Sequence, residues 1–204
     1  MAEPLRAIVA TPLNRFDRRR EKTRVDLLQA AENVIARKGF HATRISDIAD
    51  EADVGLGTFY LHFKTKNEVF AELVANGSEQ LRAEIAQAKL GVSEPEQKLR
   101  ITIATVLDAA AEHPELFRIV FGHSPAFLDL MVRVHEVFVN DLADDLRPAL
   151  GARAALVAQL TVGMLSRAIE WLIAGDAPAI DELKDTTTNF ALGGFARASA
   201  RSAG

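Results

Sequence analysis

A short run of polar side chains near position 60 gives this sequence its clearest chemical signal. Thr58, Tyr60 and His62 place two hydroxyls and an imidazole at alternate positions. Such groups hydrogen-bond to phosphate oxygens and to the edges of nucleic-acid bases. The rival hypothesis, an enzyme with a helical core, lacks support, because the sequence has no paired nucleophile and base, no glycine-rich phosphate loop and no His-Glu-x-x-His motif. The run therefore favours a surface that binds nucleic acid.

The segment around this run, residues 43–63, predicts two short helices joined by a tight turn. The first helix fits residues 45–52, the turn lies around Asp53, and the second helix fits residues 56–63. This arrangement is the outline of a helix-turn-helix unit, whose second helix presents its N-terminal residues to the major groove of DNA. The residues expected to anchor the second helix are Val54, Phe59 and Phe63, and those expected on or near its outward side are Leu56, Gly57, Thr58, Tyr60, Leu61 and His62.

The combination of residues in this part of the chain resembles the tetracycline-repressor (TetR) family. The matching residues are Ala30-Ala31, Gly39-Phe40, Thr43, Ile48-Ala49, Val54, Gly57-Thr58-Phe59-Tyr60, Phe63, Lys64 and Lys66. The strong resemblance covers residues 18–70, and the remainder is similar only in length and helix content. It implies an all-α fold, with an N-terminal three-helix helix-turn-helix domain and a C-terminal helical domain for ligand binding and dimerisation.

The resemblance also implies roles for individual residues. Lys66 is expected to grip a phosphate at the start of the fourth helix, with Thr58 and Tyr60 on the DNA backbone. Arg44 and Ser46 are expected to touch phosphate or a base from the preceding helix. The candidate DNA contacts are Arg44, Ser46, Leu56, Gly57, Thr58, Tyr60, Leu61, His62, Lys64 and Lys66. Two plainer interpretations stay open: Arg44 is simply solvated, or His62 packs against the first helix.

Two positions depart from the usual pattern of the family. Asp53 stands where a turn glycine is common, and aspartate enters the left-handed backbone region at some cost. Gly55 stands where a serine often caps the reading helix, and glycine is the weaker cap by a few tenths of a kcal/mol. These departures leave the helix-turn-helix assignment intact but weaken any borrowed base-by-base interpretation.

Charge is distributed unevenly along the 204 residues. The net charge is -4, yet the first 24 residues hold seven basic and three acidic side chains. Residues 1–70 hold twelve basic and ten acidic side chains, whereas the rest holds twelve and eighteen. The basic cluster at the front is compatible with nucleic acid or with a solvated tail.

Composition sets further limits on the class of protein. The absence of cysteine excludes disulfides and thiolate metal sites and suits a reducing cytoplasm. No signal peptide is predicted, and the apolar stretch at 154–174 is interrupted by Gln159, Arg167 and Glu170, which argues against a membrane span. A cytoplasmic location, without a cofactor, is the expectation.

Helical periodicity predicts the remaining elements and a division into two domains. Residues 1–17 are expected to form a mobile arm, and the first helix runs from residue 18 to Gly39, with Val25, Leu28, Ala31 and Ile35 as its apolar stripe. Further helices are predicted at 66–88, 98–112, 116–121, 124–146, 151–174 and 178–198. We expect a DNA-binding domain at 18–66 and an effector-binding and dimerisation domain at 67–200.

Apolar and aromatic residues in the back half predict a ligand pocket. The candidate ligand contacts are Phe117, Phe121, Phe127, Met131, His135, Phe138, Met164, Arg167 and Trp171. A stripe at helical spacing is also what an ordinary core requires, so plain packing is the alternative for each residue. Arg167 either pairs with Glu170 or meets an anionic head group. The histidines lack ligand spacing on one helix, so no metal site is predicted.

The resemblance implies partners as well. The last two helices, which are rich in alanine and glycine, are expected to form a homodimer that presents two reading helices to a palindromic double-stranded DNA operator. The run from Gly57 to Lys64 is similar to that of fatty-acid-degradation repressors, which respond to acyl-coenzyme A. This implies a repressor released by a small, largely apolar ligand such as acyl-coenzyme A or another lipid-like molecule. The alternative is a constitutive DNA-binding protein without an effector.

Overall fold

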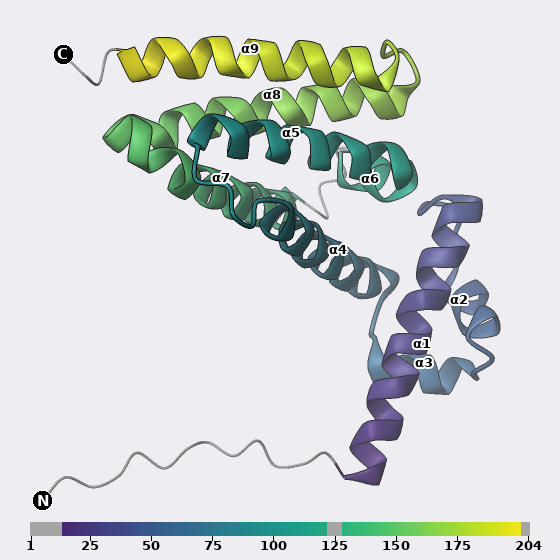
Figure 1. The fold of residues 1–204 in the computed structure, drawn as a ribbon. Helices are drawn as coiled ribbons and strands as arrows, with labels where there is room; N and C mark the ends of the chain where they lie inside the picture. The colour runs from purple at the N-terminus through teal and green to yellow at the C-terminus, as the bar shows by residue number, and fades with distance from the viewer. Residues whose placement is uncertain (1–13, 122–127, 201–204) are drawn as a thin grey trace, which may run out of the picture.

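The computed structural model describes residues 14–121 and 128–200, and all of their regular structure is helical, which confirms the expected all-α fold. Figure 1 shows the arrangement of these elements. The helices are α1 (Arg15–Lys38), α2 (Ile45–Glu51), α3 (Leu56–His62), α4 (Lys66–Ala88), α5 (Pro95–Glu112), α6 (Pro114–Val120), α7 (Leu128–Leu150), the 3-10 turn η2 (Gly151–Arg153), α8 (Ala154–Ala174) and α9 (Ile180–Ala200).

The first helix is longer than the sequence suggested. It begins at Arg15, because the Oδ1 atom of Asn14 accepts hydrogen bonds from the backbone N–H groups of Phe16 and Asp17, at 2.8 and 2.9 Å. The prediction of a mobile arm at residues 1–17 is therefore wrong for residues 15–17, which belong to α1. Val25 was expected in the apolar stripe but is 54% exposed, since the buried face of α1 begins only at Leu27.

The front of the chain forms a core of its own, which we call the N-terminal core. It is built on buried side chains from α1, α2, α3 and the first half of α4. Its largest fully buried members are Leu27, Ile35, Ile48, Phe59, Phe63 and Phe70. Gly39 ends α1 with a φ of 75°, and its N–H donates to the carbonyl of Ile35 at 2.7 Å. This exit turns the chain back so that α2 can pack on α1.

Helices α5, α7, α8 and α9, with the second half of α4, surround the C-terminal core. Its fully buried members include Leu99, Ile103, Leu107, Leu142 and Leu146. In Figure 1, α8 and α9 lie side by side at the end of the molecule away from α2 and α3. The predicted start of the helix at 124 falls outside the described residues.

Helix α4 belongs to both cores. Val69, Phe70 and Val74 are buried in the N-terminal core, whereas Leu81 and Ile85 pack in the C-terminal core. Figure 1 shows α4 running from α3 to the layer of α5 and α7. One continuous helix therefore connects the two cores, and a domain boundary at residue 66 stays a prediction.

One stretch of the described chain, Leu128–Ala174, meets the length and hydropathy criteria for a membrane span, with a mean hydropathy of 1.3. It comprises α7, η2 and α8, which pack against each other as a hairpin. Core helices of folded domains meet the same criteria, and Leu142, Leu146 and Leu165 of this stretch are buried in the C-terminal core.

Candidate nucleic-acid interface

The turn between α2 and α3 has the tight geometry that a helix-turn-helix unit needs. Asp53 adopts a φ of 51°, in the left-handed region. The N–H of Val54 then donates to the carbonyl of Ala49 at 3.0 Å, which closes the turn. Ala49 is fully buried, and its small side chain allows α2 and α3 to pack closely. The aspartate thus takes a left-handed conformation that glycine adopts with less strain.

Helix α3 has one buried side and one side open to a partner. Phe59 is fully buried, while Leu56, Tyr60 and Leu61 are 49%, 55% and 72% exposed. A seven-residue helix that exposes three large, partly apolar side chains to solvent is unusual, because exposed apolar residues that cluster mark a binding surface. A Cβ atom added at Gly57 would meet nothing within 4 Å, so packing within the chain does not require a glycine there. A close approach by an external partner would account for it.

Arg24 fastens the C-terminal end of α3 to α1 and α4. Its Nη1 atom donates to the carbonyl of His62 at 2.9 Å, and its Nε atom donates to Glu72 Oε1 at 2.9 Å. Its guanidinium also lies 4.3 Å from the centroid of the Phe63 ring. This cluster was not predicted from the sequence, because Arg24 and Glu72 lie 48 positions apart and no local pattern links them.

Lys66 contacts the turn between α1 and α2. Its Nζ atom donates to the carbonyls of Phe40 and Thr43, at 2.7 and 2.8 Å, and lies 4.3 Å from the centroid of the Phe40 ring. Burial lowers the pKa of Lys66 below its ordinary value. In this structure the ammonium ties α4 to the turn that positions α2. A contact between Lys66 and phosphate stays a prediction.

The remaining predicted DNA contacts flank α3. Arg44 is exposed at the start of α2, where its backbone N–H donates to Asp47 Oδ2 at 2.9 Å, and Ser46 is half-buried. Lys64 is exposed, and Thr58 is half-buried. Burial lowers the pKa of His62 below its ordinary value, and the positive charges of Arg20 and Arg24 lower it further. The helices α2 and α3, which carry or adjoin these residues, lie together at one end of the molecule (Figure 1).

A second site lies between the two cores. A cavity of about 510 Å³ opens between α4, α5, α6 and α7, with Glu32 of α1 at its edge. Its apolar lining is Leu73, Val74, Leu81, Ala109, Leu116, Phe117, Val134 and Phe138. Its acidic lining is Glu32, Glu84, Asp108 and Glu112, and of these Asp108 pairs with Lys184 at 2.7 Å. No lysine or arginine is among the described residues that line it.

The structure brings only some of the predicted ligand contacts to this cavity. Phe117 and Phe138 line it, whereas Phe121, Met131, His135 and Met164 are half-buried elsewhere. Phe127 lies outside the described residues. Arg167 and Trp171 face outward from α8, at 79% and 46% exposure, and Arg167 pairs with Glu170 at 2.7 Å. Helical periodicity located apolar positions but not which helix face borders the cavity, so the lining from α4 was missed.

His135 has a partner within the C-terminal half. Its Nε2 atom lies 2.6 Å from Ser166 Oγ, which in turn donates to the carbonyl of Val162. Burial lowers the pKa of His135 below its ordinary value. The imidazole is thus a hydrogen-bonded link between α7 and α8. Among the described residues, no group of three His, Asp or Glu side chains is placed to hold a metal ion.

The outer face of α8 and α9 exposes apolar and small residues together. Leu156, Leu160 and Phe190 are 62%, 65% and 75% exposed. A Cβ atom added at Gly163 or Gly193 would meet nothing within 4 Å, so neither glycine is required by packing inside this chain. Such a face has the composition of a helix–helix interface.

Comparisons with known proteins find one matching family and several solved structures of similar fold. Residues 27–73 match the family of bacterial regulatory proteins, tetR family. A TetR-family transcriptional regulator of Syntrophomonas wolfei matches with a TM-score of 0.75 at 16% identity, covering 86% of this chain and 96% of that one. A TetR-like transcriptional regulator of Rhodococcus sp. RHA1 matches with a TM-score of 0.67 at 24% identity, covering 90% of this chain and 98% of that one. The transcriptional regulator FadR of Bacillus subtilis, solved in complex with stearoyl-CoA, matches with a TM-score of 0.66 at 20% identity, covering 82% of this chain and 96% of that one.

Proposed function

Because this chain belongs to the TetR family of DNA-binding transcriptional regulators, we propose that it is a repressor that binds a palindromic operator as a homodimer and is released by a small ligand. The observation that carries the proposal is the open side of α3, where Leu56, Tyr60 and Leu61 are exposed beside a glycine that internal packing does not require. A short helix of this kind inserts into the major groove. Its place of action is the cytoplasm, where bacterial DNA lies.

The outer face of α8 and α9 supports the dimer. Exposed leucines and Phe190 are removed from water when a second copy covers them, and Gly163 and Gly193 allow close helix approach. In such a two-fold dimer, binding to a palindrome requires the two α3 helices to lie about 34–36 Å apart, one turn of DNA. Leu160→Glu would put a charge into the interface and should yield monomers by native mass spectrometry.

The cavity between α4 and α7 supports a small effector. Its volume of about 510 Å³ lies within the range of ligand sites, roughly 300–1,000 Å³. Its lining is largely apolar and includes the rings of Phe117 and Phe138. A ligand that binds better to the dimer when the spacing of its two α3 helices does not fit DNA shifts the dimer away from DNA.

The structure of Bacillus subtilis FadR with stearoyl-CoA makes a long-chain acyl-CoA the first ligand to test. The acyl chain suits the apolar lining of the cavity. The phosphates of coenzyme A would meet Glu32, Glu84 and Glu112, and like charges repel. We therefore propose that an acyl chain occupies the cavity and that a polyanionic head group stays outside it.

The decisive experiment begins with a duplex selected from a random pool by the full-length protein. We expect a palindrome, bound by a dimer, and Tyr60→Ala should weaken binding to every sequence tested. Stearoyl-CoA and uncharged 1-octadecanol are then added separately, and release is followed by fluorescence anisotropy. If Tyr60→Ala binds like the parent, α3 is not the helix that contacts DNA.

A variant that fills the cavity separates the effector hypothesis from constitutive binding. Gly77 lines the cavity, and a Cβ atom there meets nothing within 4 Å, so Gly77→Leu should fold with part of the cavity filled. It should bind DNA like the parent and resist release by either ligand. If neither ligand, nor any apolar compound tried after them, alters DNA affinity of the parent, the chain is a constitutive DNA-binding protein.

A further inference from the structure

The first two turns of α1, residues 15–22, project from the N-terminal core without packing on it. We call this segment the basic extension. Every one of its residues is exposed, including Phe16 at 83%, and the buried face of α1 begins only at Leu27. Burial of apolar surface therefore contributes nothing to holding this segment as a helix.

The charge of the basic extension is poorly suited to an isolated helix. It carries five basic and two acidic side chains. Within the part of the chain that the structure describes, Arg15, Arg18, Arg19 and Arg20 make no ion pair, whereas Lys22 pairs with Asp26. Cations near a helix N-terminus oppose the positive end of the helix dipole. This arrangement is unfavourable for the free chain and becomes favourable beside a polyanion.

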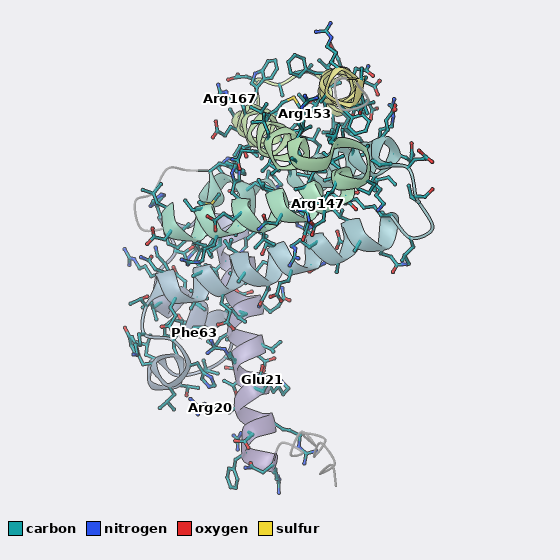
Figure 2. All side chains as sticks on the ribbon, turned by 90° about the vertical axis from the view of Figure 1, so that its left-hand side faces the viewer. Arg20, Glu21, Phe63, Arg147, Arg153 and Arg167 are labelled. Atoms are coloured by element: carbon teal, nitrogen blue, oxygen red, sulfur yellow. The ribbon has the colours of Figure 1, made fainter. Side chains whose placement is uncertain are left out.

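The position of the basic extension identifies that polyanion. Arg24 holds the carbonyl of His62, at the end of α3, and Arg20 lies one turn earlier on α1. From Arg24 to Arg15 the helix continues for about 14 Å. Figure 1 shows α1 extending past α3 on the side away from α8 and α9, and Figure 2 shows Arg20 on that end of α1, beyond Phe63. DNA whose major groove receives α3 has its backbone on both sides of that groove.

We propose that the basic extension binds the phosphate backbone of DNA beside the half-site that α3 occupies. Arg18 and Arg19 lie three and four positions after Arg15, which puts both beside it on one face of the helix. Guanidinium groups bind phosphate through paired hydrogen bonds. The contacts add affinity and a longer footprint, and they carry no base sequence. This inference rests on the proposed function, because it needs α3 to bind DNA.

The test compares two lengths of the selected duplex. One is trimmed to about 20 base pairs, enough for two half-sites one turn apart. The other has about eight more base pairs at each end, more than the basic extension can span. The full-length parent is compared with Arg18→Gln/Arg19→Gln, in which helix propensity is preserved. The charge-matched control is Arg100→Gln/Arg147→Gln, which removes two exposed arginines of α5 and α7; Arg147 lies far from Arg20 in Figure 2.

Affinity is measured by fluorescence anisotropy over a range of salt concentrations. On the long duplex, Arg18→Gln/Arg19→Gln should flatten the plot of log affinity against log salt by about 0.9 for each phosphate that is no longer neutralised, so by about 2 per protomer. Its hydroxyl-radical footprint should shorten at both ends. On the trimmed duplex it should bind like the parent, and the control should match the parent on both.

Equal salt slopes for parent and variant on the long duplex would overturn the proposal. An equal reduction of affinity on both duplexes would overturn it too, because the arginines would then bind phosphates inside the half-site. Failure of the proposed function looks different: Tyr60→Ala would bind both duplexes like the parent, whatever the arginine variants do.

Discussion

The two cores of this molecule share one kind of polar contact and differ in the open space beside them. In the N-terminal core, charged side chains donate to backbone carbonyls: Arg24 to His62, and Lys66 to Phe40 and Thr43. The C-terminal core has contacts of the same kind, such as Arg118 to Ile173, but its helices α5, α6 and α7 also line a cavity of about 510 Å³. Contacts that fix the backbone suit a surface that must match DNA. Helices that line a void suit a site that adapts to a ligand.

The prediction with the largest expected effect truncates one fully buried side chain in each core, in separate variants. Phe59→Ala truncates a fully buried ring and should lower the free energy of unfolding by about 3–5 kcal/mol. We expect DNA binding to be abolished while native mass spectrometry still detects a dimer. Leu142→Ala, in the C-terminal core, should cost about 2–5 kcal/mol and weaken the dimer as well. If urea unfolds both variants in one transition by every probe, the two cores are a single cooperative unit.

The next effect in size distinguishes a positioning lysine from a phosphate contact. Lys66→Met leaves the carbonyls of Phe40 and Thr43 without their donor and should lower the free energy of unfolding by about 1–3 kcal/mol. DNA affinity should fall with no change in salt slope. A slope flatter by about 0.9 for each phosphate would instead indicate direct phosphate binding. Lys64→Met, at an exposed side chain, is the matched control for stability alone, because Lys64 is itself a candidate DNA contact; it should alter stability by less than about 0.5 kcal/mol.

A smaller effect comes from the turn between α2 and α3. Asp53 has a φ of 51°, which glycine adopts with less strain. Asp53→Gly should raise the free energy of unfolding by at most about 1 kcal/mol, because glycine also gives the unfolded chain more freedom. Asp53→Ala should lower it by a similar amount. Thermal unfolding of both variants measures the difference, and an alanine variant as stable as the glycine variant would show that the turn is not strained.

The smallest predicted effect is a pH dependence shared by the two regions. Burial lowers the pKa of His62 and of His135, so the folded chain binds protons less readily than the unfolded chain. Stability should therefore fall as the pH drops below about 6.5, where unfolded histidine takes up its proton. His135→Gln, which keeps a hydrogen-bonding group opposite Ser166, should reduce that fall. Urea midpoints at about pH 7.5 and about pH 5.5 give the comparison.

The sequence predicted the helix-turn-helix unit far better than the pocket, and the reason is physical. Gly39 and the run from Gly57 to Tyr60 can be recognised in the sequence, because turn geometry and helix length depend on residues that are neighbours in the chain. The ion pair of Arg24 with Glu72 joins residues 48 positions apart, so local patterns do not contain it. Most of the cavity lining was missed because a stripe such as Met131, His135 and Phe138 has the same period whether it borders a void, a core or a second subunit.

The continuity of α4 has a consequence for how such a regulator would respond in the cell. Leu73 and Val74 line the cavity on the same helix whose Glu72 binds the arginine that holds α3. If a ligand in the cavity weakens DNA binding by some factor, thermodynamic linkage requires DNA to weaken ligand binding by the same factor. Copies seated on an operator would therefore need a higher ligand concentration than free copies. Excess free protein would act as a sink for the ligand, and the threshold for induction would rise with the amount of regulator present.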